Sequence, residues 1–322
     1  MQPAHRKPLL IAFSKLLVDS ELEVSTRAVE SIRELGGSLE LDEAPLLFVN
    51  LRQVLVSENV DMRRSLARSA PYLAPFCPPN SQNYEFLKEV LASILKDENA
   101  EVKANLMLHC EALGKSFSHQ QLASYFSAQL LDLLGDKSWK VRKEAVAAFE
   151  ILALRLGESF PAEERIQKTI KERLADRVFE VRVRMIEAIK NLSAVFGRDW
   201  TEKTALGILS PFATNPNFLY RLSYVFGIKE ICGGVGNAVA MKEADILFKM
   251  ARDPVPNVRV QAILTLVKIV RQVEEKSLED RLMSLLKDLE GDSDTDVQRI
   301  VGRGTSSSLK QVLNRLVDLK LI

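Results

Sequence analysis

One phrase of seven residues recurs along the chain at nearly constant intervals, and this recurrence constrains the fold more than any other feature. The phrase is an aspartate or a close substitute, four variable residues, an apolar residue, and then usually arginine or lysine. Its eight copies begin at residues 19, 57, 97, 136, 176, 215, 253 and 292, which gives steps of 38, 40, 39, 40, 39, 38 and 39 residues. Such a period predicts stacked copies of one supersecondary unit.

The residues after each phrase also repeat, at offsets of 0, 4, 7, 8 and 11 from the apolar residue. The set Val141, Ala145, Ala148, Phe149 and Leu152 recurs as Val181, Met185, Ala188, Ile189 and Leu192. These offsets lie on one face of a helix. The third column is small in most copies, which predicts a neighbouring helix that crosses closely. Its members are Ser31, Ser69, Ala148, Ala188, Gly227 and Thr265, and His109 is the exception.

Another amphipathic segment precedes each phrase, as in residues 122–134, so each unit reads as helix, turn, helix. A period near 39 with two helices and no strand pattern is typical of HEAT repeats. We therefore predict an all-α fold, an α-solenoid of about eight HEAT repeats forming one armadillo-like superhelix over residues 1–322. The predicted repeats span residues 4–37, 42–76, 83–115, 119–157, 162–197, 199–234, 239–274 and 276–304.

The last repeat departs from the pattern, because Gly302 and Gly304 interrupt its second helix. We expect that helix to break there. A final helix at about 306–321, capped by Ser306, would then cover the open end of the stack, as terminal repeats require.

The phrase predicts how the turns are built and joined. An aspartate or asparagine can cap the second helix, which would place Pro216 and Pro254 at the first helical position. Stacking would also bring the aspartate of one unit near the arginine of its neighbour, giving a ladder of ion pairs. Because a single exposed pair contributes only ~0 to 1 kcal/mol, the ladder is expected to fix register more than stability.

The overall composition favours protein partners. The chain has 44 Lys+Arg and 43 Asp+Glu, and no local basic patch is evident in the sequence, so we expect no nucleic-acid partner. We also expect no membrane span, since no apolar run reaches about 18 residues. The apolar run 9–18 resembles a signal peptide, but Lys15 interrupts it. Three scattered cysteines fit a reducing compartment, predicted to be the cytoplasm, with the nucleus left open.

No enzyme site emerges from the sequence. The three histidines lack metal-ligand spacing, and His109 is read as a core residue. The segment Cys232-Gly233-Gly234 follows a helix and lacks the lysine of a phosphate loop, so it is read as a left-handed helix end. We predict no catalytic, metal or cofactor site.

An aromatic column stands in three consecutive turns: Trp139, Phe179 and Phe218 each lie three residues after the aspartate or asparagine, and Pro256 follows in the next turn. This position is about 200° around a helix from the buried apolar residue, which predicts side chains that point away from the core. Aromatics in register indicate either a binding ridge or a stack that closes the edge of the solenoid. The sequence leaves both open.

Four segments in order resemble the C-terminal repeats of the scaffold (A) subunit of protein phosphatase 2A. They are Asp136-Lys-Ser-Trp-Lys-Val-Arg142, Phe196-Gly-Arg-Asp-Trp200, Asn215-Pro-Asn-Phe-Leu-Tyr-Arg221 and Met250-Ala-Arg-Asp-Pro-Val-Pro-Asn-Val-Arg259. The resemblance implies a non-catalytic scaffold whose turns bind a Ser/Thr phosphatase catalytic subunit. The implied partner-binding residues are Trp139, Phe179, Trp200, Phe218, Leu219, Tyr220, Arg221, Pro256 and Asn257.

Binding of a B-type regulatory subunit is left open, because with about eight repeats the N-terminal platform of that family is not represented. The alternative interpretation is a HEAT adaptor of another class, either a transport carrier or a cytoskeleton-associated array.

Overall fold

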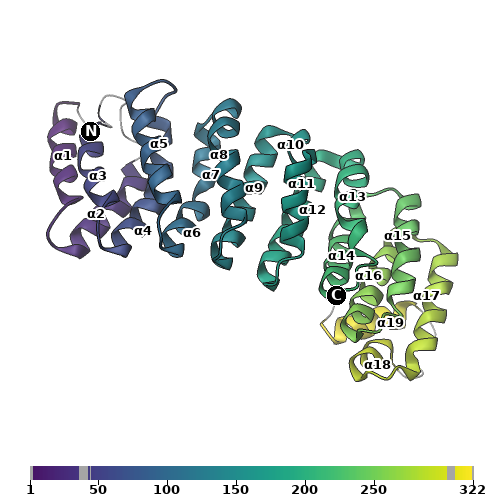
Figure 1. Ribbon diagram of the computed structural model, residues 1–322. Helices are drawn as coiled ribbons and strands as arrows, with labels where there is room; N and C mark the ends of the chain where they lie inside the picture. The colour runs from purple at the N-terminus through teal and green to yellow at the C-terminus, as the bar shows by residue number, and fades with distance from the viewer. Residues whose placement is uncertain (1–2, 36–42, 44, 303–308, 321–322) are drawn as a thin grey trace. The chain divides into compact units, whose positions relative to one another are not determined.

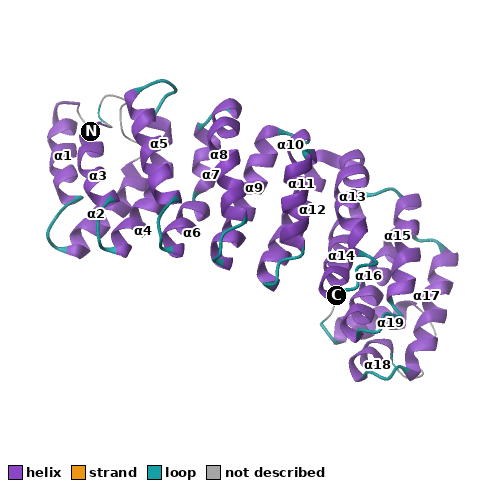
Figure 2. Ribbon diagram, in the orientation of Figure 1, coloured by secondary structure: helices purple, strands orange, loops and turns teal. Residues whose placement is uncertain are grey.

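The computed structural model describes residues 3–35, 43, 45–302 and 309–320, and every regular element in these ranges is a helix. Figure 2 shows helices joined mostly by short loops, without a strand in the described part of the chain. The chain divides into two compact units, Met1–Gly157 and Glu158–Ile322. Each is described by itself.

Unit 1 is a two-layer stack of helical hairpins. Its second helices α2, α4, α6 and α9 lie side by side in that order, each paired with the helix that precedes it (Figure 1). The helices are α1 (Pro3–Leu16), α2 (Leu22–Leu35), α3 (Pro45–Leu55), α4 (Val60–Ser69), α5 (Gln82–Leu95), α6 (Ala100–Leu108), α7 (Cys110–Ser116), α8 (His119–Leu134) and α9 (Trp139–Leu156).

Unit 2 is built in the same way, with second helices α12, α14, α16 and α18 as successive neighbours. Its helices are α10 (Ser159–Ala162), α11 (Glu164–Leu174), α12 (Phe179–Trp200), α13 (Leu206–Leu209), α14 (Phe218–Ile231), α15 (Asn237–Met250), α16 (Pro256–Val273), α17 (Lys276–Asp288), α18 (Thr295–Val301) and α19 (Leu309–Asp318). A π-helical turn, Thr201–Ala205, joins α12 to α13.

The predicted apolar columns form the core of both units. In α9 and α12 every member of the five-residue sets is buried, from Val141 to Leu152 and from Val181 to Leu192. The small column is tightly packed: a Cβ added to Gly227 would lie 2.6 Å from Cδ2 of Leu209 on α13. Small residues at this column therefore let the second helix approach its neighbours closely.

The second helices begin two residues later than predicted. Helix α16 starts at Pro256 and α14 at Phe218, so Pro254 and Pro216 lie in the turns and not at the first helical position. The physical reason is that the Asp253 carboxylate accepts the backbone N–H of Val255, at 2.9 Å, and so closes a side-chain turn instead of capping the helix. The true N-cap stands two residues further on, as Asn217 does by accepting the N–H of Leu219.

His109, the bulky exception in the small column, coincides with a break in the second helix. Its backbone (φ −111°, ψ 7°) separates α6 from α7. The ring is half-buried, with Nδ1 3.4 Å from the Tyr72 hydroxyl. Burial, and after it the charges of Arg33 and Arg68, lower the pKa of this imidazole. The sequence did not predict the break, because the apolar periodicity continues through it.

The C-terminal end agrees with the predicted helix break. Helix α18 stops at Val301, and Gly302 adopts φ 79°, a conformation that glycine tolerates best. Val312 and Leu316 of α19 are buried, as expected for a covering helix. The predicted cap Ser306 lies outside the described residues. At the Cys232 segment the helix ends as predicted, but through a 3-10 turn and without positive φ.

Candidate functional site

In both units, basic residues of second helices tie an intra-repeat turn to the next turn. In unit 2, Arg221 donates Nη1 to the carbonyl of Asn215 in its own turn, at 2.8 Å, and Nε to Oδ2 of Asp253 in the following turn, at 2.6 Å. Arg259 continues the series with Oδ1 of Asp292, at 2.6 Å. The predicted ladder is therefore present, and its members are mostly buried rather than exposed.

Unit 1 has the same ladder with a lysine in one place. Arg63 donates Nε to Asp97 at 2.7 Å, and Lys103 donates Nζ to Asp136 at 3.0 Å. Burial acts to raise the pKa of the Asp97 carboxyl. Hydrogen bonds from Arg63 and from the backbone of Asn99, with the charges of Arg63 and Lys103, nevertheless hold this pKa below its usual value. The turns are thus linked by charge-assisted hydrogen bonds.

Arg182 differs from its counterparts because the next turn carries the neutral Asn215 in place of an aspartate. Its Nη1 donates to the carbonyl of Asp176, at 2.7 Å, and its guanidinium lies 5.5 Å from the ring centroid of Phe179. Burial lowers the pKa of Arg182, while Asp176 and Glu180 act to raise it. This arginine therefore lies over the face of an aromatic ring in the turn.

The predicted aromatic column points outward in all three turns. Trp139, Phe179 and Phe218 are the first residues of α9, α12 and α14, and their exposed fractions are 39%, 51% and 39%. Trp139 belongs to unit 1, whereas Phe179 and Phe218 lie on neighbouring helices of unit 2. Pro256, the first residue of α16, is half-buried.

In unit 2 the aromatic column extends into a larger apolar surface. Residues four and eight positions further along a helix lie on the same side, and here they are apolar too. The rings of Phe179 and Phe226 meet edge to face at 6.3 Å, which joins α12 to α14. We call this surface the apolar stripe, and all of its members are exposed or half-buried: Phe179, Val183, Phe218, Leu222, Phe226, Pro256 and Val260.

Sequence reasoning missed four members of the stripe, Val183, Leu222, Phe226 and Val260. They follow the turn residues Phe179, Phe218 and Pro256 by four or eight positions, so a helical-wheel count from the aromatic column would have found them. In the sequence these residues are hard to separate from the apolar core columns, because core and stripe residues interleave along the same helices.

The remaining predicted turn residues surround the stripe with mixed exposure. Leu219 is half-buried and Asn257 is exposed. Tyr220 packs its ring edge to face on Phe212 at 5.2 Å, and Arg221 is held by the ladder. These last two side chains shape the turn, and their main contacts are within the chain.

Trp200 must be removed from the predicted binding surface. It is 5% exposed, packs on Phe196 with ring centroids 5.3 Å apart, and donates Nε1–H to the carbonyl of Glu158. The reason is a kink at Gly197 (φ 83°), which turns the end of α12 back over the start of the unit.

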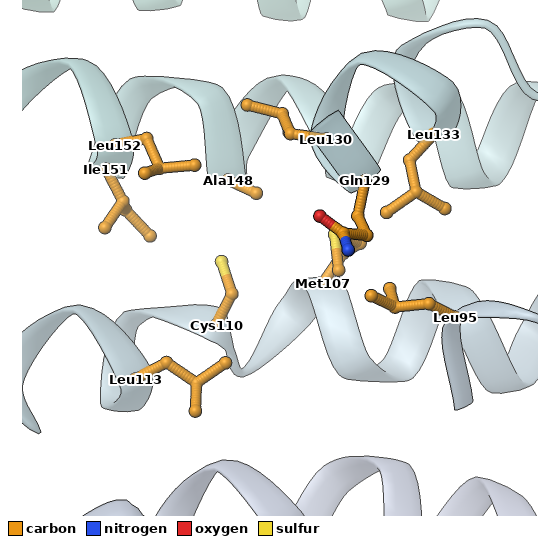
Figure 3. A pocket seen from close by; sticks show the side chains of 10 residues that line it. All are labelled: Leu95, Met107, Cys110, Leu113, Gln129, Leu130, Leu133, Ala148, Ile151 and Leu152. Atoms are coloured by element: carbon orange, nitrogen blue, oxygen red, sulfur yellow. The ribbon is translucent and has the colours of Figure 1, made fainter. Parts of the chain in front are cut away.

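Unit 1 also contains a small apolar void of about 30 Å³ between α5, α6, α7, α8 and α9 (Figure 3). Met107 and Cys110, on either side of the break at His109, line it, and Gln129 is its one amide. A volume near that of a single water molecule identifies a packing defect beside the broken helix, not a ligand site.

Among the described residues no group of three or more His, Cys, Asp or Glu side chains is placed to hold a metal ion. In the same part of the chain, no helix has the length and apolarity needed to cross a bilayer.

Known proteins with a similar sequence motif or a similar fold were compared with this chain. A HEAT repeat model matches residues 245–273, which cover the end of α15, the turn and the whole of α16. No curated protein sequence matches the chain.

Two solved structures share the fold over nearly the whole chain. Importin beta, crystallised in ammonium sulfate, superposes with a TM-score of 0.69 at 9% identity, covering 98% of this chain and 41% of importin beta. The karyopherin Kap121p, bound to the extreme C-terminus of the protein phosphatase Cdc14p, gives 0.66 at 12% identity, covering 97% and 33%. The chain thus spans less than half the length of either. Its fold class is the predicted one, an all-helical α-solenoid of HEAT type.

Proposed function

We propose that this chain is a non-catalytic scaffold that binds a Ser/Thr phosphatase catalytic subunit through the apolar stripe and the turns of unit 2. The observation that carries the proposal is the stripe itself. Seven apolar side chains on α12, α14 and α16 remain exposed or half-buried, two of them aromatic rings at the turns. Contiguous apolar surface of this kind marks protein-binding sites, and aromatic anchors dominate their affinity.

The ladder supports the same proposal by holding the turns in place before a partner arrives. Arg221 and Arg259 fix successive turns of unit 2, and Arg182 supports the Phe179 ring. A rigid surface loses less conformational entropy on binding, which favours affinity. The resemblance of the turn segments to the phosphatase 2A scaffold then supplies the identity of the partner.

The proposal is tested by direct binding of the purified chain to a purified phosphatase 2A catalytic subunit, measured by calorimetry. Phe179→Ser and Phe218→Ser together should abolish the interaction, whereas Leu154→Ser, at 40% about as exposed as Phe218 but outside the stripe, should leave it unchanged. If the wild-type chain does not bind the catalytic subunit, the proposal is wrong.

The alternative, an adaptor for transport or for the cytoskeleton, is tested in the same format. The adaptor function would replace the phosphatase proposal if the wild-type chain bound karyopherin cargo peptides or tubulin and the double variant at Phe179 and Phe218 did not. A B-type regulatory subunit, added to the preformed complex, addresses the second partner separately.

A further inference from the structure

Unit 1 carries a groove on the equivalent face of its second helices, with a different chemistry from the apolar stripe. Helix α6 forms the floor and α4 and α9 form the walls, since α6 lies between these two neighbours. The floor is low because it carries Ala104 and Asn105 where the walls carry arginine, lysine and tryptophan. The groove encloses about 320 Å³.

The groove has an excess of positive charge. Its lining includes four cations, Arg64, Arg68, Lys140 and Lys143, against the two carboxylates Glu101 and Glu144. The sequence did not reveal this patch, because its two pairs of cations lie more than 70 residues apart and only stacking brings them together.

Not all of these charges are available to a ligand. Arg64 donates to Glu101 at 2.8 Å and to Asp61 at 2.5 Å, so its charge is compensated within the chain. Arg68 donates to a neutral amide, Asn105, at 2.7 Å, with Glu30 more distant at 3.7 Å. Lys143 makes no ion pair with any described residue. Lys143 on the α9 wall is therefore the least compensated cation of the lining, whereas Arg68 on the α4 wall and Lys140 keep longer ion pairs, at 3.7 Å to Glu30 and at 4.0 Å to Glu101.

Two apolar side chains stand beside these cations. Trp139 lines the α9 wall and is 39% exposed, and Leu108 at the end of the floor is 57% exposed. Isolated large apolar side chains next to cations offer contact to a ligand that has both a negative charge and an apolar group.

We propose that this groove binds an acidic peptide segment of a protein partner, with carboxylates toward Arg68 and Lys143 and an apolar side chain on Trp139 and Leu108. Neighbouring helices pack about 8–10 Å apart, so the two walls leave room for one extended or helical segment above α6. Charge complementarity identifies the occupant, because a carboxylate finds Lys143 on the α9 wall, without an ion pair to any described residue, and Arg68 on the α4 wall, whose ion pair to Glu30 is long at 3.7 Å.

A peptide fits this surface better than a nucleic acid. Glu101 lies in the lining, with Lys140 4.0 Å from its carboxylate. A continuous phosphate backbone bears a charge every few ångströms and would have to pass this carboxylate, whereas a peptide can place a neutral residue there. The inference stands apart from the phosphatase proposal, since it concerns another unit and needs no catalytic subunit.

The test uses the purified chain and a short labelled peptide of glutamates around one phenylalanine, with binding followed by fluorescence anisotropy. We expect saturable binding that weakens with salt, and a loss of about tenfold in affinity for Lys143→Glu. Lys137→Glu, the same charge change at an exposed site of the turn outside the groove, should bind as the wild type does.

Trp139 supplies a local readout. The chain has two tryptophans, and the buried Trp200 can be replaced by phenylalanine, so that Trp139 emission reports on the groove alone. The peptide should shift this emission in the Trp200→Phe background, and the Lys143→Glu change should remove the shift without altering the thermal unfolding midpoint.

Three results of the peptide experiments would overturn the proposal. They are no binding at millimolar peptide, equal binding of a peptide in which lysines replace the glutamates, and equal affinity of the Lys143→Glu and Lys137→Glu variants. Stronger binding of a single-stranded oligonucleotide through the same lysine would also overturn it, in favour of a nucleic-acid site.

Discussion

Arg63 of α4 donates Nε to Oδ2 of Asp97 over 2.7 Å, and this contact between residues 34 apart in the sequence joins two successive turns. The side chains are only 21% and 9% exposed. The pair is partly buried, so its contribution to the free energy of unfolding depends on its geometry and on the hydrogen bonds that accompany it.

Asp97→Asn tests what the charge contributes. Asparagine can still accept the turn N–H, as Asn215 does from Asn217 at 2.9 Å, so the variant removes mainly the ion pair. We expect a loss of about 1–3 kcal/mol in the free energy of unfolding at pH 7, measured by urea denaturation.

The same variant has a defined pH dependence. Because the folded pKa of Asp97 lies below its unfolded value of about 3.9, the unfolded state binds the proton more readily and stability rises with pH. The contribution is present above about pH 5 and is lost as the pH falls through the folded pKa. The gap between wild type and Asp97→Asn should therefore close below pH 4. Asp199→Asn, at a side chain 90% exposed, should give no such gap, and a pH-independent difference for Asp97→Asn would contradict the assignment.

Ala188→Leu tests the small column. Ala188 is fully buried where α12 meets its neighbours, so three additional heavy atoms must displace packed side chains. We expect destabilisation by about 1–3 kcal/mol in denaturant unfolding. Glu187→Leu, at the adjacent exposed position, is the matched control and should change stability by less than about 0.5 kcal/mol. Equal effects would show that the small column has no packing role.

Phe218→Ala tests the apolar stripe quantitatively. Loss of an aromatic at the centre of an interface often costs about 2 kcal/mol or more, which corresponds to roughly thirtyfold in Kd for the catalytic subunit. Since Phe218 is 39% exposed, the unfolding midpoint should change little. A lowered midpoint with unchanged affinity would instead identify the ring as an internal contact between turns.

Trp200 gives the opposite expectation. Trp200→Phe keeps the ring packed on Phe196 and loses the hydrogen bond to the Glu158 carbonyl, at a cost of about 0.5–1.5 kcal/mol. Trp200→Ala should cost about 3–5 kcal/mol. Neither change should alter catalytic-subunit affinity while the protein remains folded, and a binding defect in a fully folded Trp200→Phe variant would restore this residue to the interface.

The sequence predicted those features that depend on nearby residues in a fixed register. The core columns follow from helical periodicity, and the pairing of Arg221 with Asp253 follows from stacking units of equal length. The helix starts were predicted wrongly because one aspartate side chain can serve either a turn or a cap, and sequence alone does not choose between them.

Features that depend on contacts between distant segments could not be predicted from the sequence. Trp200 is buried against a carbonyl 42 residues earlier, and the local sequence contains no sign of that contact. The groove brings Arg68 together with Lys143 across three repeats, a juxtaposition that only the stacking of the repeats creates. The kink at Gly197 changes the direction of α12, and the periodic pattern of apolar residues does not predict it.

The doubly bonded turn aspartates have a mechanical consequence. Asp253 accepts the N–H of Val255 with Oδ1, and the guanidinium of Arg221 donates to both of its oxygens, so this aspartate fixes its own turn and the distance of that turn from the previous one. The phrase keeps seven residues in every copy, whereas the distance between copies varies from 38 to 40. The spacing between successive turns is therefore fixed by these bonds, whereas the length of chain between one turn and the next varies from repeat to repeat. We therefore expect that any bending within a unit moves the far ends of the helices more than the turns, so that the spacing of the turns changes least.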